Sequence, residues 1–165
     1  MRLPLTMAQL NELPEDDWRD TLRAVIGLVE WIDAVAAARP YPDRATLLSL
    51  AEREVLALRP EQVRAALADH PRIGAATVPG SSAAREQSGV DPADAALLER
   101  LRAGNRAYEA RFGRIYLVCA AGRSGPELLA DLTARLDNDP DTEIHVTRTE
   151  LAAITRKRLE GTVIP

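Results

Sequence analysis

The chain has 165 residues, a formal net charge of −4 and a pI near 5.3, which predicts a single domain over residues 1–165. One cysteine excludes an internal disulfide, and two unclustered histidines argue against a His/Cys metal site. The acidic balance argues against nucleic-acid binding. No apolar run approaches the roughly 18 residues that span a bilayer, and the start MRLPLTMAQL lacks a long apolar signal region. We therefore expect a soluble cytoplasmic protein.

Helix formers dominate the first half of the chain, where proline, glycine and aspartate separate the expected helices. These residues predict five helices: one capped by Thr6 through Leu10, one with Pro14 at its first position that Gly27 interrupts or ends, one over 28–38, one capped by Asp43, and one opened by Pro60.

The second half predicts helices of very different lengths around one strand-like run. They are two turns over 82–88, a long helix from Asp91-Pro92 to Phe112 that Gly113 stops, one opened by the capping box Ser124-Gly125-Pro126-Glu127, and one capped by Thr142 to about residue 160. Residues 115–120 form the only strand-like apolar run of this length. A lone strand builds no sheet, so we expect an all-α fold of eight or nine helices with one buried extended segment, whose backbone groups need other partners.

His70 is the first candidate for chemistry, because imidazole transfers protons near neutral pH and Pro71 places it at a helix exit. A surface or capping histidine is the more common arrangement for such a residue. Glu86 and Gln87 lie in a helix too short to persist on propensity alone, although a solvated polar helix beside Arg85 is by itself the simpler explanation of these residues.

Arg158 shares a helical stripe with Leu151 and Ile154, so its guanidinium must either pair with an anion or extend along the apolar surface to reach solvent. An anionic substrate and a carboxylate of another helix are equal alternatives. Asn105 lies on the apolar stripe of its helix, where we expect it to bridge backbone groups of a neighbouring segment. Cys119 is expected to be an inert core thiol, and we assign no role to His145.

Six segments, taken in order, resemble the family of 2-oxo-4-hydroxy-4-carboxy-5-ureidoimidazoline (OHCU) decarboxylases of urate degradation. The segments are Leu10-Asn11-Glu12-Leu13 with Trp31 and Arg39-Pro40-Tyr41, His70-Pro71-Arg72-Ile73-Gly74, Arg85-Glu86-Gln87-Ser88-Gly89, Asn105-x-x-Tyr108-x-x-x-Phe112-Gly113, Leu136-Asp137-Asn138, and residues 154–159. Each segment is weak alone, but six in register are specific. Ala83 departs from the family, many of whose members have serine three residues before the glutamate.

The resemblance implies an all-helical, cofactor-free homodimer that acts on a small molecule, binds neither nucleic acid nor membrane nor metal, and releases CO2 to give (S)-allantoin. It implies that His70 is the catalytic acid/base and that Glu86 orients the substrate or His70. The substrate-binding residues that it implies are Pro71, Ala83, Ala84, Arg85, Gln87, Tyr116, Leu117, Val118, Cys119, Ala120 and Arg158.

The residue types suit this chemistry, since the substrate's carboxylate lies beside a ring C=N that accepts the electrons without a cofactor. A non-catalytic helical binding or dimerisation module, and another cofactor-free lyase or hydrolase on the same scaffold, are the alternatives. The joint presence of His70, Glu86 and Arg158 favours the decarboxylase, because a binding module does not need all three.

Overall fold

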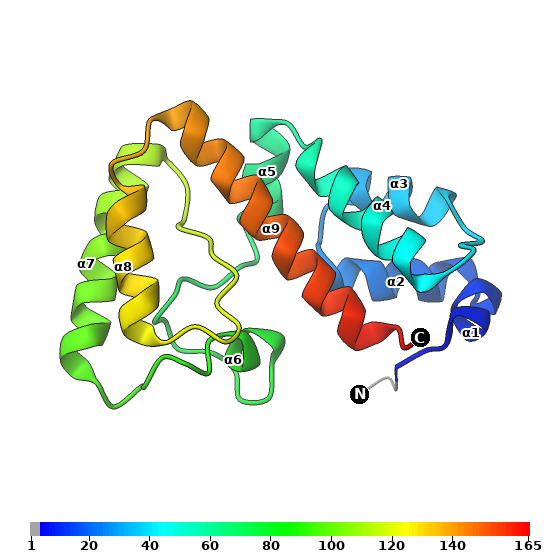
Figure 1. Cartoon of the computed structure of the whole chain (residues 1–165), viewed down its shortest axis with the longest axis horizontal. Coiled ribbons are helices and arrows are strands. Elements are labelled where there is room, and N and C mark those ends of the chain that lie inside the picture. The colour runs from blue at the N-terminus through cyan, green and yellow to red at the C-terminus, as the bar shows by residue number, and fades with distance from the viewer. Residues whose placement is uncertain (1–3) are drawn as a thin grey trace. The chain divides into compact units, whose positions relative to one another are not determined.

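The computed structural model describes residues 4–165, in which the chain forms nine α-helices and no strand beyond an isolated bridge between Leu5 and Val163 (Figure 1). The all-α expectation is therefore confirmed for the described residues. Contacts divide the chain into two compact units, one of residues up to 66 with 151–165 and one of residues 67–150. That the chain is a single domain stays a prediction.

The first unit packs its helices around two buried tryptophans. Its helices are α1 (Met7–Glu12), α2 (Glu15–Val25), α3 (Val29–Ala37), α4 (Arg44–Leu56), nearly all of α5 (Pro60–Leu67) and the part of α9 (Pro140–Thr162) that follows residue 150. The indole N–H of Trp18 donates to the Tyr41 hydroxyl at 3.1 Å, and that of Trp31 donates to the Ala51 carbonyl at 3.1 Å. Both rings are therefore buried with their polar atoms satisfied.

Helix starts in the first unit follow short-range signals. Thr6 and Gln9 form a capping box on α1, and the Asp43 side chain accepts from the Thr46 amide at 2.7 Å at the start of α4. Both predicted caps are confirmed. Pro14 immediately precedes α2 rather than occupying its first position, and α2 ends at Val25, two residues before Gly27.

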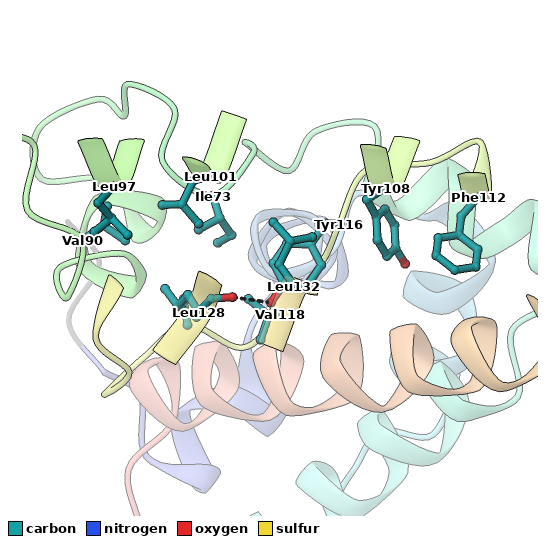
Figure 2. Packing of buried hydrophobic residues seen from close by; sticks show 11 residues of the cluster. Ile73, Val90, Leu97, Leu101, Tyr108, Phe112, Tyr116, Val118, Leu128 and Leu132 are labelled. Atoms are coloured by element: carbon teal, nitrogen blue, oxygen red, sulfur yellow. Dashed lines mark hydrogen bonds between the residues drawn. The ribbon is translucent and has the colours of Figure 1, made fainter. Parts of the chain in front are cut away.

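The second unit is built on two helices that lie side by side, α7 (Ala95–Phe112) and α8 (Gly125–Arg135), together with α6 (Ser82–Glu86) and residues 140–150 of α9 (Figure 1). The packing is close at two glycines, since a Cβ at Gly104 would lie 2.6 Å from Cδ2 of Leu132 and one at Gly125 would lie 2.4 Å from Cδ2 of Leu97, so a larger residue at either position would displace that leucine side chain. Buried residues form what we call the α7–α8 core (Figure 2): Ile73, Val90, Leu97, Leu101, Tyr108, Phe112, Tyr116, Val118, Ala120, Leu128 and Leu132.

Two predicted helix starts in this unit are wrong. Helix α7 begins at Ala95, because Asp94 accepts from the Leu97 amide at 3.0 Å, whereas Asp91 accepts from the Ala93 amide and forms a turn. Helix α9 begins at Pro140, since the Asp139 carboxylate accepts from the backbone N–H of Thr142 at 2.9 Å. Thr142 therefore lies inside the helix that it was predicted to cap.

Two other helix boundaries predicted for the second unit, the end of α7 and the start of α8, are confirmed. Gly113 ends α7 in the left-handed region at φ +68°, and Ser124 and Glu127 form the predicted capping box on α8. The extended segment, residues 115–120, joins these helices without helical turns or strand pairing (Figure 1). Within residues 4–165, no helix has both the length and the apolar content needed to cross a membrane.

Candidate active site

The His-Pro loop, which we define as residues 70–74, begins where α5 ends. The backbone N–H of His70 donates to the Leu67 carbonyl at 3.0 Å and closes the helix. His70 and Pro71 are half-buried, and the Nε2 atom of His70 is buried. The prediction that the imidazole lies at a helix exit is confirmed.

Two buried side-chain amides hold this loop. Gln87 accepts from the Gly74 backbone N–H at 3.0 Å through Oε1 and donates to the Arg72 carbonyl at 3.3 Å through Nε2. Asn105 of α7 donates to the Ile73 carbonyl at 3.0 Å. Backbone groups of three consecutive loop residues are thereby fixed by side chains that are at least nine-tenths buried.

The contacts of Gln87 connect Glu86 to the His-Pro loop. Glu86 is the last residue of α6, and Gln87 follows it directly. Because both amide atoms of Gln87 bond the loop, they fix the end of α6 against the segment that carries His70. Each of the two amide atoms of Gln87 can form one further hydrogen bond. A contact between Gln87 and the substrate would have to use these remaining positions. Asn105 bridges a neighbouring backbone segment as predicted.

A cavity of about 230 Å³ lies between the His-Pro loop and α7. Its lining includes Arg72 and Glu109, which form an ion pair, and the hydrogen bonds that Arg72 donates to Glu109 raise the pKa of the Arg72 guanidinium. Neither His70 nor Glu86 nor the extended segment lines this cavity.

The extended segment is held by side chains rather than by a neighbouring strand. The Leu117 carbonyl accepts from Nη1 of Arg135 at 2.6 Å, and the Cys119 backbone N–H donates to Oε2 of Glu150 at 2.7 Å. The Ala120 carbonyl accepts from the Arg123 N–H at 3.0 Å. The expectation that this backbone finds side-chain and loop partners is confirmed for these three groups.

A buried ion pair positions Arg135. Glu143 is 0% exposed and accepts from Arg135 Nη2 at 2.6 Å, from the Tyr108 hydroxyl at 2.5 Å and from Asn138 at 2.9 Å. Burial lowers the pKa of the Arg135 guanidinium, but the hydrogen bond and charge of Glu143 outweigh burial and raise it overall. Burial also raises the pKa of Tyr108, and its hydrogen bond to Glu143 adds to the shift.

Sequence reasoning missed this ion pair, although a signal for it exists. Glu143, Thr147 and Leu151 recur every four residues on α9, and all three are fully buried. Polar residues on a buried helical stripe need partners, which is the same argument that singled out Asn105.

Three segments that are distant in sequence share the α7–α8 core (Figure 2). Ile73 belongs to the His-Pro loop, Val90 lies four residues after Glu86, and Val118 and Ala120 belong to the extended segment. The three segments predicted to carry most of the site are therefore parts of one packed unit.

The remaining predicted residues have different environments. Ala83 and Ala84 are half-buried in α6, while Arg85 is exposed and donates to the Gly80 carbonyl at 2.7 Å. Arg158 belongs to the first unit, where it is half-buried and its Nη1 donates to the Val25 carbonyl at 2.9 Å. Whether Arg158 also binds an anion, as the sequence suggested, stays a prediction.

The described part of the chain contains no group of three or more His, Cys, Asp or Glu side chains that could hold a metal ion.

Comparisons with known proteins place this chain in one family. A family model described as OHCU decarboxylase matches residues 11–160. The chain is 26% identical to the 2-oxo-4-hydroxy-4-carboxy-5-ureidoimidazoline decarboxylase of Amia calva, covering 96% of this chain and 95% of that protein. It is 24% identical to the uric acid degradation bifunctional protein TTL of Arabidopsis thaliana, covering 90% of this chain but only about half, 47%, of the length of that relative.

A solved structure has the same fold. The crystal structure of OHCU decarboxylase in the presence of (S)-allantoin matches with a TM-score of 0.73 and 27% identity, covering 89% of this chain and 96% of that one.

Proposed function

Because the chain belongs to the OHCU decarboxylase family, we propose that it decarboxylates 2-oxo-4-hydroxy-4-carboxy-5-ureidoimidazoline to (S)-allantoin without a cofactor. The match over residues 11–160 is the observation that carries this proposal. The packing of the His-Pro loop, the residues after α6 and the extended segment on one core supports it, because a site needs its groups on rigid, mutually fixed elements.

The substrate supplies the electron sink for this reaction. The bond between the ring carbon and the carboxylate breaks, CO2 leaves, and the electron pair moves into the adjacent C=N. A proton must then reach the neighbouring ring carbon on one face, which sets the (S) configuration. His70 is our candidate for this proton transfer, a role that typically contributes a factor of about 10² to 10⁴ in rate.

Glu86 and Gln87 would position the reacting groups. A carboxylate beside an imidazole fixes its tautomer and orientation, or accepts from the substrate's N–H groups. Gln87 supports this arrangement through the loop that it holds, since its amide bonds the backbone of Arg72 and Gly74. Pro71, Ala83, Ala84 and Arg85 remain proposed substrate contacts from the resemblance.

The backbone of residues 116–120 would read the ureido and ring amides of the substrate, because a flat ligand rich in N–H and C=O groups pairs well with peptide groups. Arg158 would bind an anionic or carbonyl edge with its planar guanidinium. An increase in KM on the substitution Arg158→Ala, measured by steady-state kinetics, checks that role; unaltered kinetics would remove Arg158 from the site.

We also propose that the protein works as a homodimer in the cytoplasm. The family resemblance supports the dimer, and the single cysteine suits a reducing compartment, where structural disulfides are rare. Light scattering checks the dimer, which has twice the 18.0 kDa mass of one chain. The mass of one chain would refute it.

The proposed reaction is tested by generating the unstable substrate from urate in the assay cell and measuring CO2 release. We expect release to be faster with the protein than in buffer, in proportion to the protein concentration. Equal rates with and without the protein would refute the function, and would leave the non-catalytic binding module as the better description.

A further inference from the structure

Two side chains hold the extended segment by alternate backbone groups. Arg135 donates to the Leu117 carbonyl, and Glu150 accepts from the Cys119 N–H. In a trans peptide, the N–H points opposite to the C=O of the same peptide group. The Val118 N–H therefore points away from Arg135, and the Val118 carbonyl points away from Glu150.

In an extended chain these two Val118 groups lie on one edge, opposite the edge that the two side chains hold. Val118 is 3% exposed, and its N–H and C=O have no hydrogen-bond partner among residues 4–165. A buried backbone donor and acceptor need partners. One donor beside one acceptor matches the adjacent C=O and N–H of a cyclic amide or a ureido group.

We propose that Glu150 is a positioning residue which, together with Arg135, presents the N–H and C=O of Val118 to the ureide part of the substrate. This inference rests on the function proposed above and assigns Glu150 a role within it. Glu150 acts through the Cys119 peptide group and does not touch the substrate itself.

Arg135 and Glu150, the two side chains that hold the extended segment, differ in how safely they can be substituted. Arg135 is 4% exposed and paired with the fully buried Glu143, so its removal would leave a buried charge and threaten the fold. Glu150 is half-buried on α9, and the proposal depends on the hydrogen bond that it accepts from the Cys119 N–H. Substitutions at Glu150 therefore test the proposal with less risk of unfolding.

Two substitutions separate the geometry of Glu150 from its charge. Glu150→Gln keeps an acceptor oxygen at the same reach without the charge. Glu150→Asp keeps the charge but withdraws the carboxylate by one carbon–carbon bond, about 1.5 Å, which takes a 2.7 Å contact beyond hydrogen-bond distance. We expect Glu150→Asp to raise KM about tenfold with kcat within about threefold, and Glu150→Gln to stay within about threefold of wild type in both.

Glu99→Asp is the matched control, because Glu99 is an exposed α7 carboxylate that pairs only with surface arginines. It should leave KM unchanged. Amide NMR spectra give a second readout: the Cys119 N–H signal should move in Glu150→Asp but not in Glu99→Asp, and the Val118 N–H signal of the wild type should move when (S)-allantoin is added.

Three results would overturn the proposal. They are wild-type KM in Glu150→Asp, the reverse order of the two variants, and a Val118 signal that is unmoved by (S)-allantoin. Thermal unfolding of each variant excludes a purely structural effect, since lost stability alone leaves KM unchanged well below the melting temperature. If the wild type itself fails to accelerate CO2 release, the proposed function fails first, and that result is separate from every variant comparison.

Discussion

Replacing His70 by alanine is expected to lower kcat by about 10²- to 10⁴-fold while the protein stays folded, because the imidazole is the proposed proton-transfer group. The loop itself should persist. Its contacts with Gln87 and Asn105 use backbone atoms of residues 72–74 and not the imidazole. Steady-state kinetics and a thermal unfolding curve of the same preparation make the measurement.

His145→Ala is the control for His70→Ala. His145 is the second of the two histidines, is exposed on α9 and has no assigned role, so its removal should leave kcat unchanged. Wild-type kcat in His70→Ala would contradict the assignment. A melting temperature that falls below the assay temperature would instead make His70 a core residue whose loss unfolds the site.

Glu143→Ala is expected to lower the free energy of unfolding by about 3–5 kcal/mol, the cost of leaving one partner of a buried ion pair uncompensated. Glu143 is 0% exposed, and its removal leaves the buried guanidinium of Arg135 with the more distant carboxylate of Asp131, at 3.6 Å, as its counter-charge. The Tyr108 hydroxyl and the Asn138 amide lose their acceptor in the same step. Urea unfolding followed by circular dichroism measures the change.

Glu99→Ala provides the comparison, since it removes an exposed carboxylate from surface ion pairs that are typically worth less than about 1 kcal/mol. A loss as small as this in Glu143→Ala would show that the α7–α8 unit does not depend on its buried ion pair, and that Arg135 is held in place by its other contacts.

Short-range signals made much of the fold predictable. Thr6, Asp43 and Gly113 act within one helical turn of their own position, so the sequence contains all that their effect requires. The same locality explains the errors. Asp91 and Asp94 are both good N-cap residues before α7. Which of them caps the helix depends on which backbone N–H groups lie within reach of its carboxylate in the folded turn.

A buried polar contact of the candidate site was predictable where a polar residue interrupts the apolar stripe of a helix. Asn105 was recognised in this way, and its bond to the Ile73 carbonyl follows. The family resemblance predicts that Gln87 contacts the substrate, and this stays a prediction; that its amide also holds the His-Pro loop was not foreseen. A tertiary contact of this kind has no signature in the spacing of residues, because residues 75–81, which have no regular structure, separate the His-Pro loop from α6.

Arg135 and Glu143 illustrate the same limit. In the sequence, each resembles an ordinary charge at a helix end. Arg135 lies in the last turn of α8 and Glu143 in the first turn of α9, where charges of these signs interact favourably with the helix dipole. Their pairing with each other and with the extended segment arises only when the two helices and residues 115–120 are packed together.

The optical activity of the product tests the account most directly. With the substrate generated from urate in a circular dichroism cell, we predict that the signal of (S)-allantoin appears in the presence of the protein at a rate proportional to its concentration, and that His70→Ala abolishes it. Racemic product, or optical activity that appears no faster than in buffer, would contradict the central claim that this chain delivers a proton to one face of the decarboxylated ring.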